Sequence, residues 1–512
     1  MTDSPRSTNL TWLLIATILG SSMAFIDYSV ANVALPVLQK ELSATLAQAQ
    51  WVVEIYILFV ASLILVGGSL GDRFGRKRVY VIGIVTFACA SIFCGLAATA
   101  NQLIVARAFQ GVGGALLIPG SLSLLRAHFG ERESGKAIGT WSGFSALMSV
   151  VGPLLGGFLI EYVSWRWIFY INIPIAIATL VILYLYVGES RSDEQGGLDY
   201  IGAVLETIGL GLVVYGLIKA GHAGLMDPEA VATFSGGIVL LLIFIVHEAR
   251  TTTPMMPLFL FRSSTFTGVN LLTLLLYGAL TGSMFFTQFA LLQVQGYTPL
   301  MAGAVFAPFA ILMFFFSRHA GRLATTTGPR LPLTIGPLLT ALGMLLFTRA
   351  GREADYWTTY FPAILVMGSG MTLVVAPLTA TAMGCVEEKY AGLASGVNNA
   401  VSRTGGLLAI AVMGIIMQIS FNANLESRLD GIDLAPRTRA ALDAERVKLA
   451  AAEIPAGLEP ERREVVQTAI FDAFIDGYHQ MLRVCALITL VGTAMAFFMI
   501  RSKPKSAGTP VA

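Results

Sequence analysis

Long apolar stretches are the feature of this sequence that most restricts its fold. A helix of about 20 apolar residues crosses the ~30 Å hydrocarbon core of a bilayer. Only 12% of the residues are charged, about half the share in a soluble protein. The sequence therefore predicts an all-α polytopic membrane protein with fourteen transmembrane helices, at residues 11–36, 51–71, 79–99, 102–125, 137–160, 167–187, 199–219, 230–247, 265–294, 299–317, 331–348, 359–383, 391–419 and 480–500.

The distribution of positive charge predicts the orientation of the chain. An even number of spans places both termini on one side, and cytoplasmic loops are enriched in Lys and Arg. With a cytoplasmic N-terminus, the inner segments hold eighteen Lys and Arg residues and the shorter outer loops hold five. We expect a multi-pass protein of the cell (inner) membrane with both termini in the cytoplasm. We read residues 11–35 as a retained helix and not as a signal peptide.

One long polar segment, residues 420–478, lies outside the membrane in this topology. It carries eleven acidic and seven basic residues, and long loops cross the membrane largely regardless of their charge. Its part Ala440–Ala452 has a helix-favouring composition. Two interpretations are open: a solvated helical excursion on the extracytoplasmic side, and a docking surface for a periplasmic adaptor protein.

The composition excludes several classes of function. A net charge of +2 provides no basic surface for nucleic acid. The stretch Gly130–Lys136 resembles a phosphate-binding loop, but Ala137 stands where a Ser or Thr would hold magnesium. The five histidines and four cysteines lack metal-ligand spacing. We expect no nucleotide, cofactor or metal site and no enzymatic activity, and we expect an ion gradient as the energy source.

An internal repeat follows the second and the tenth apolar stretch. Gly68–Arg78 and Gly321–Arg330 share a Gly-x-Leu opening, a seven-residue Gly-to-Gly interval and a basic exit. The acid is lost in the second copy, where Thr325 corresponds to Asp72. Duplicated halves are common in transporters, and both copies fall in cytoplasmic loops of the expected topology.

Five ordered motifs resemble those of a known transporter family, the fourteen-helix drug:proton antiporters (EmrB/QacA-like multidrug exporters) of the major facilitator superfamily. The first-helix signature is Phe25–Pro36 and the loop motif is Gly68–Arg78. The motif with an intramembrane arginine is Leu103–Gly113. The antiporter motif is Gly152–Gly157, and its extension is Trp165–Pro174. The antiporter motif departs from the family at Met148, where a glycine is usual.

The resemblance implies a fold of two six-helix bundles with two inserted helices. Residues 1–190 would form the N-terminal bundle, 191–262 the two-helix insert and linker, and 263–512 the C-terminal bundle. It also implies proton-coupled efflux of small amphipathic compounds by alternating access, with protons and the lipid bilayer as the other partners. The alternative is a specific exporter of a single metabolite or antibiotic.

Ionisable side chains inside the apolar stretches are the candidates for proton coupling. Each one costs about 2.5–3.5 kcal/mol on insertion scales, and Asp27, Glu54 and Arg107 fall at similar depths. A neighbouring arginine favours the charged form of a carboxyl, and its withdrawal favours protonation. The resemblance implies this role for Asp27 and Arg107. The alternatives are a static Asp27–Arg107 ion pair and a solvated boundary acid at Glu54.

Two glycine-rich motifs are candidates for conformational roles. The antiporter motif allows close helix approach and a kink, and it acts either as a pivot or in packing alone; its residues are Gly152, Pro153, Gly156 and Gly157. The loop motif forms a tight cytoplasmic turn that the resemblance implies is a gating loop; its residues are Gly68, Asp72, Arg73, Gly75 and Arg76.

Three further polar residues in apolar stretches are candidates for the substrate cavity. Glu206 is either a structural acid of the insert or a neutralising group for cationic cargo. Arg403 is either a tie to carbonyl groups of a neighbouring helix or a contact with the cargo or the proton site. Asn398 lies five residues before Arg403 in the same stretch.

Overall fold

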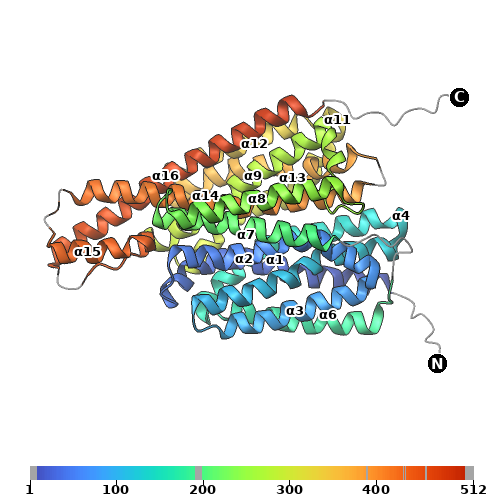
Figure 1. Ribbon diagram of the computed structural model, residues 1–512, viewed down its shortest axis with the longest axis horizontal. Helices are drawn as coiled ribbons and strands as arrows, with labels where there is room; N and C mark the ends of the chain where they lie inside the picture. The colour runs from blue at the N-terminus through green and yellow to red at the C-terminus, as the bar shows by residue number, and fades with distance from the viewer. Residues whose placement is uncertain are drawn as a thin grey trace. The chain divides into compact units, whose positions relative to one another are not determined.

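The computed structural model describes residues 9–190, 199–387, 390–430, 432, 434–455 and 458–501 (Figure 1). The described part is helical and contains no strand. Its α-helices are α1 Leu10–Glu41, α2 Leu46–Phe74, α3 Arg76–Leu96, α4 Ala100–Tyr162, α5 Trp167–Tyr170, α6 Asn172–Tyr186, α7 Tyr200–Ala223, α8 Pro228–Arg250, α9 Ser264–Phe289, α10 Pro299–Ala304, α11 Ala307–Thr327, α12 Pro332–Phe347, α13 Phe361–Gly384, α14 Ala391–Leu429, α15 Pro436–Glu445 and α16 Pro460–Met499. Short 3₁₀ or π turns connect some of them, at η1 Leu258–Arg262, η2 Ala290–Val294, η3 Tyr356–Tyr360 and η5 Arg446–Ala451.

The length and composition of these helices confirm an all-α, multi-pass membrane protein. Among the described residues, 12 helices are long and apolar enough to cross a membrane. Two shorter apolar helices, Val151–Tyr162 and Pro332–Phe347, fall on two further expected spans. The count of fourteen stays a prediction.

The helix α4 covers two of the expected spans, 102–125 and 137–160. Its contacts with α1 show that the chain turns back within it. In chain order, the α4 residues and their α1 partners are Arg107 with Asp27, Trp141 with Ser21, and Gly156 with Val30. The contact point on α1 thus moves toward the N-terminus and then returns. The two expected stretches, 102–125 and 137–160, therefore run in opposite directions along α1, although both belong to α4.

The chain divides into two compact units. Unit 1 comprises the described parts of Met1–Met255, Met284–Phe306 and Ile410–Gln480, and unit 2 comprises those of Met256–Ser283, Ala307–Ala409 and Met481–Ala512. The division into 1–190, 191–262 and 263–512 stays a prediction.

Unit 1 is held together by close helix approach at glycines of α4. A Cβ atom at Gly113 would lie 2.7 Å from the Phe87 amide nitrogen of α3, and one at Gly111 would lie 2.7 Å from the Tyr56 carbonyl oxygen of α2. Only glycine permits backbones to pack at this distance. These glycines therefore set the spacing of α2, α3 and α4, which pack against one another and are drawn in blue to cyan in Figure 1.

Unit 2 contains its own polar and apolar contacts. Its apolar cluster includes Phe266 of α9 and Val397 of α14. In the same helices, the Asn398 amide Nδ2 donates to Thr273 Oγ1 at 2.8 Å and to Asn270 Oδ1 at 3.1 Å. Interhelical hydrogen bonds of this kind stabilise helix pairs in a membrane.

The polar segment 420–478 forms a helical extension of unit 1. It comprises the end of α14, then α15 and η5, and the start of α16, shown in orange to red in Figure 1. Arg428 pairs with Asp476 at 2.7 Å, and Glu426 pairs with Arg439 and Arg446. The helical character expected for Ala440–Ala452 is confirmed, as the end of α15 followed by the 3₁₀ turn η5.

The extension contacts the ends of α1 and α2 through η5. The Gln39 Nε2 atom of α1 donates to the Lys448 carbonyl oxygen at 3.4 Å. Beside it, Leu449 is fully buried and has a φ of 56°, a backbone conformation that a branched residue adopts only when its surroundings impose it. The extension is therefore docked on unit 1 at this end.

We expect Gly113→Ala to lower the melting temperature of the detergent-solubilised protein, because overpacking a tight contact costs about 1–3 kcal/mol. The matched control is Gly236→Ala in α8, where an added Cβ meets nothing within 4 Å. Alanine there improves helix propensity by up to ~1 kcal/mol and should leave the melting temperature unchanged or slightly higher. Equal melting temperatures for the two variants would contradict the packing argument.

Candidate functional site

The structure brings Asp27 and Arg107 into direct contact inside unit 1. Asp27 is on α1 and Arg107 is on α4, and a guanidinium Nη1 atom of Arg107 donates to Asp27 Oδ2. The two residues are 2% and 0% exposed. Since burying a single charge in an apolar interior is costly, the opposite charges stabilise each other here.

A polar network extends from this ion pair. Gln110 Nε2 donates to Asp27 Oδ1 at 2.7 Å and to Ser91 Oγ at 2.9 Å, while Gln110 Oε1 accepts from Arg107 Nη1 at 2.7 Å. Asn172 Nδ2 also donates to Ser91 Oγ, at 3.3 Å. Gln110, Ser91 and Asn172 are all fully buried. Helices α1, α3, α4 and α6 thus meet at one hydrogen-bonded cluster.

Sequence reasoning did not single out the partners of this ion pair. Gln110 and Asn172 lie within motifs that carry the family resemblance, but a neutral amide in an apolar stretch gives no charge signal. Ser91 is an unremarked residue of the third stretch. The helical spacing of three residues from Arg107 to Gln110 is the signal that would have found Gln110, because residues at i and i+3 share a face.

The Arg107 guanidinium has further contacts that fix its position. Its Nε donates to the Val52 carbonyl oxygen of α2 at 3.0 Å, and its Cζ lies 4.3 Å from the centre of the Tyr56 ring. A cation over an aromatic face is attracted by the ring quadrupole. Within the described residues, the Nη2 atom has no hydrogen-bond partner. Arg107 therefore keeps one donor available beside Asp27.

Glu54 lies outside this hydrogen-bonded cluster. It is on α2 and fully buried. Neither of its carboxyl oxygens has a hydrogen-bond partner among the described residues. Among the described residues, Glu54 therefore makes no hydrogen bond to Asp27 or Arg107, and the similar depth of the three side chains stays a prediction.

The antiporter motif packs tightly on two partners. A Cβ atom added at Gly152 would collide with Ser29 of α1. A Cβ atom added at Gly156 would lie 2.5 Å from Val30 Cγ1, also on α1. These contacts give the motif a packing role on α1. Its role as a pivot stays a prediction.

The same motif also contacts α10. An added Cβ at Gly157 would lie 2.6 Å from Leu300 Cα, and one at Gly303 would collide with the Pro153 carbonyl oxygen. One turn beyond Gly157, Glu161 Oε2 accepts from the Leu300 amide at 3.1 Å. The second half of the antiporter motif and α10 thus meet backbone to backbone.

The loop motif, Gly68–Arg78, covers the end of α2 and the start of α3, and the turn between the two helices is at Gly75. Gly75 has a φ of 110°, which lies in the region that favours glycine. The Glu189 carboxylate, from the segment after α6, accepts from the amides of Lys77 at 3.0 Å and Arg78 at 3.2 Å. It thereby caps the N-terminus of α3. The sequence did not identify this residue.

The other residues of the loop motif have less distinct surroundings. Arg73 is exposed, with its guanidinium carbon 5.5 Å from the centre of the Phe74 ring. The Arg76 amide donates to the Ser190 carbonyl oxygen at 2.9 Å, and an added Cβ at Gly68 would be in ordinary contact with Pro119. The side chain of Asp72 lies outside the described residues.

The three cavity candidates occupy different places. Glu206 is half-buried on α7, within electrostatic range of Glu248 on α8. Arg403 is half-buried on α14. Asn398 is buried in the hydrogen bonds to α9 described above, which fits a helix tie. A cargo-binding role for these three stays a prediction.

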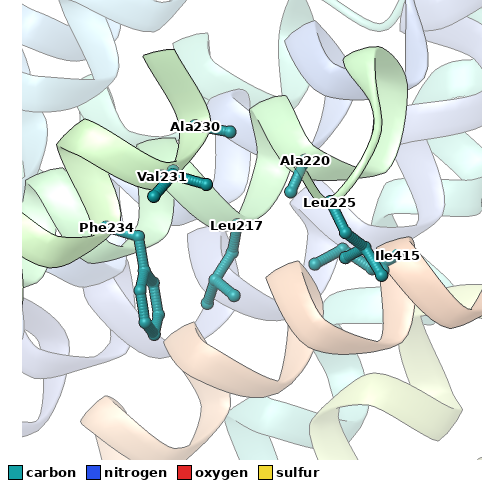
Figure 2. Close-up of a pocket in the computed structure, with 8 residues that line it drawn as sticks. Leu217, Ala220, Leu225, Ala230, Val231, Phe234 and Ile415 are labelled. Carbon is teal, nitrogen blue, oxygen red and sulfur yellow. The ribbon is translucent and has the colours of Figure 1, made fainter. Parts of the chain in front are cut away.

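An apolar pocket of about 220 Å³ lies between α7, α8 and one turn of α14. Figure 2 shows the side chains of Leu217 and Phe234 directed into it, with Ile415 of α14 on the other side.

Among the described residues, no group of three or more His, Cys, Asp or Glu side chains could hold a metal ion.

Comparison with known proteins gives consistent matches over most of the chain. The chain is 30% identical over 497 residues to the tetracenomycin C resistance and export protein of Streptomyces glaucescens, covering 96% of this chain and 92% of that protein. It is 32% identical over 490 residues to the multidrug resistance protein Stp of Mycobacterium tuberculosis, covering 94% and 90%. A third relative, the methylenomycin A resistance protein of Bacillus subtilis, is 31% identical and covers 82% and 90%.

The fold matches solved transporter structures. A bacterial homologue of the human lysosomal transporter Spinster, in an inward-facing and unoccupied conformation, superimposes with a TM-score of 0.68 at 18% identity and covers 98% of this chain and 99% of that chain. The family model described as Major Facilitator Superfamily matches residues 17–410. This protein therefore belongs to the major facilitator superfamily.

Proposed function

We propose that this protein exports small amphipathic compounds across the cell membrane in exchange for protons. The observation that carries the proposal is the buried Asp27–Arg107 pair with its hydrogen-bonded cluster. The relatives named above are resistance and export proteins, which supports outward transport of drug-like compounds. The orientation proposed from the loop charges places both termini in the cytoplasm and the 420–478 extension outside.

The chemistry of the proposed exchange follows from the pair. With Arg107 in contact, the Asp27 carboxylate is stabilised in its charged form. When a change of conformation separates the two side chains, the isolated carboxylate is costly in the apolar interior and takes up a proton. When the contact re-forms, the proton is released. One cycle therefore moves one proton at Asp27, and Gln110 keeps the carboxyl oriented in both states.

The same observations accommodate a narrower function, the export of a single metabolite or antibiotic. Two of the relatives are named for resistance to one antibiotic each, whereas Stp is named for multidrug resistance. Competition between chemically unrelated dyes for transport separates the two functions. Mutual inhibition by several of them supports multidrug export, and transport of a single chemical class supports the specific exporter.

We expect Asp27→Asn to abolish proton-driven accumulation of dye in everted vesicles while leaving the amount of inserted protein unchanged. Asparagine cannot take up or release a proton, but it can still accept hydrogen bonds from Gln110 and Arg107. Unlabelled-for-labelled cargo exchange should continue, since it requires no net proton movement. The matched control is Asp430→Asn, at a carboxylate that is 69% exposed. Undiminished accumulation in Asp27→Asn would overturn the proposal.

We expect Arg107→Ala to change the pH dependence of transport, because the guanidinium is the charge partner of the carboxyl that we propose to carry the proton. Truncating one partner of a buried ion pair is strongly destabilising, at about 3–5 kcal/mol. The profile should therefore be measured on protein shown to be monodisperse by size-exclusion chromatography. An unaltered profile at equal protein amount would favour a static ion pair.

We expect Gly157→Val to reduce transport at least tenfold, because a side chain at this position prevents the close approach of α10. Insertion and cargo binding should persist if the contact forms only in one state of the cycle. Gly236→Val, on an open face of α8, is the control for β-branching in a helix. Equal transport by both variants would show that the α4–α10 contact has no part in transport.

A further inference from the structure

The start of α7 and the end of α8 carry a polar cluster that the proposed transport chemistry does not use. Asp199 immediately precedes α7, and His247 and Glu248 lie in the last turn of α8. Asp199 is 7% exposed and Glu248 is 3% exposed. Two adjacent carboxylates in a buried site repel each other. This cluster therefore requires a positive charge or a proton.

The two carboxyl oxygens of Asp199 have different partners. Oδ1 accepts from the Gly202 amide at 2.8 Å, which caps α7, and it lies 2.8 Å from His247 Nε2. Oδ2 faces Glu248, since a Cβ atom at Gly202 would lie 2.5 Å from Asp199 Oδ2 and 2.9 Å from Glu248 Oε1. A side-chain hydrogen bond joins the two acids. Apart from Glu248, no group among the described residues donates to Oδ2.

The bond between the two acids identifies the missing group as a proton. An ionised carboxylate only accepts hydrogen bonds, so one of two hydrogen-bonded carboxyl groups must be protonated. The helix ends determine which one. Asp199 caps the N-terminus of α7, where negative charge is favoured, whereas Glu248 lies at the C-terminus of α8, where negative charge is disfavoured. Glu248 therefore holds the proton and donates it to Asp199 Oδ2.

The other charged groups around the cluster do not replace this proton. Glu206 of α7 is within electrostatic range of Glu248 and adds negative charge. Arg250, two residues after Glu248, is exposed. Helix α2 packs on α7, and its stretch 58–69 contains no acidic or basic residue. Within the described ranges, the base in contact with Asp199 is His247, and no group of side chains could hold a metal ion.

We propose that Glu248 and Asp199 share one proton, which joins the end of α8 to the start of α7 and is released at alkaline pH. Its release places a second carboxylate beside Asp199 and near Glu206, and the like charges push the helix ends apart. This proton site is separate from Asp27 and does not depend on the export function. In the orientation proposed above, this end of the two helices faces the cytoplasm, so the joint responds to cytoplasmic pH.

The first test is the pH dependence of the melting temperature of the purified full-length protein. Above the pH at which a free glutamate ionises, the native protein holds a proton that the unfolded chain has released, so its stability falls as the pH rises. Glutamine keeps an N–H donor toward Asp199 but cannot ionise. We expect Glu248→Gln to match the wild type near neutral pH. Between neutral and alkaline pH, the wild type should lose at least about 2 °C more than this variant.

Two control variants isolate the contribution of Glu248. Glu459→Gln removes a carboxylate that is 80% exposed and should keep the pH dependence of the wild type. His247→Gln keeps a donor toward Asp199 and removes the titration of the imidazole. Its melting temperature should still fall at alkaline pH, because the shared proton remains.

The second test detects the proton itself by infrared difference spectroscopy. A protonated carboxyl group has a C=O stretching band that an ionised carboxylate lacks. At neutral pH, the wild type minus Glu248→Gln difference should contain one such band, which shifts in D₂O, and the wild type minus Glu459→Gln difference should contain none. The inference is overturned if Glu248→Gln retains the full acid band of the wild type, or if the melting temperatures of the two proteins fall in parallel with pH.

Discussion

The cost of holding a charge away from water governs the arrangement of unit 1. Asp27 and Arg107 would each be expensive alone in the apolar interior, and together they form a pair that is held by contacts from five helices, α1, α2, α3, α4 and α6. The carboxylate comes from α1, a carbonyl oxygen from α2, a hydroxyl from α3, the guanidinium and an amide from α4, and a second amide from α6. Because a half-satisfied buried network is less favourable than an apolar core, the cluster ties the positions of these helices to the state of one ion pair.

The sequence allowed the fold and the central pair to be predicted for a simple reason. A charged residue within twenty apolar ones stands out, so Asp27, Glu54 and Arg107 could be found without any structure. Neutral partners such as Gln110 and Ser91 give no such signal. Glu189 is harder still to predict, because it caps α3 from a position 112 residues along the chain from Lys77. Local spacing carries no information on contacts of this range.

At α4, the sequence pattern predicted the two apolar spans but not the helical structure of the residues between them. Two apolar stretches with a polar interval predicted two spans, and the contacts with α1 confirm two antiparallel passes. The polar residues between the two apolar stretches are also helical. Helix formation depends on local propensity, and polar residues can form a helix as well as apolar ones. Hydropathy identifies which residues lie in the membrane and says little about where a helix ends.

The contact between the antiporter motif and α10 has a consequence for motion. Its two surfaces are glycine Cα atoms and carbonyl groups, at Gly157 against Leu300 and at Gly303 against Pro153. Surfaces of this kind have no rotamers to order or release. They can part and meet again with little entropic cost, unlike an interface of long interdigitated side chains. A seam of bare backbone therefore packs tightly, and its separation would release or order no side-chain rotamers.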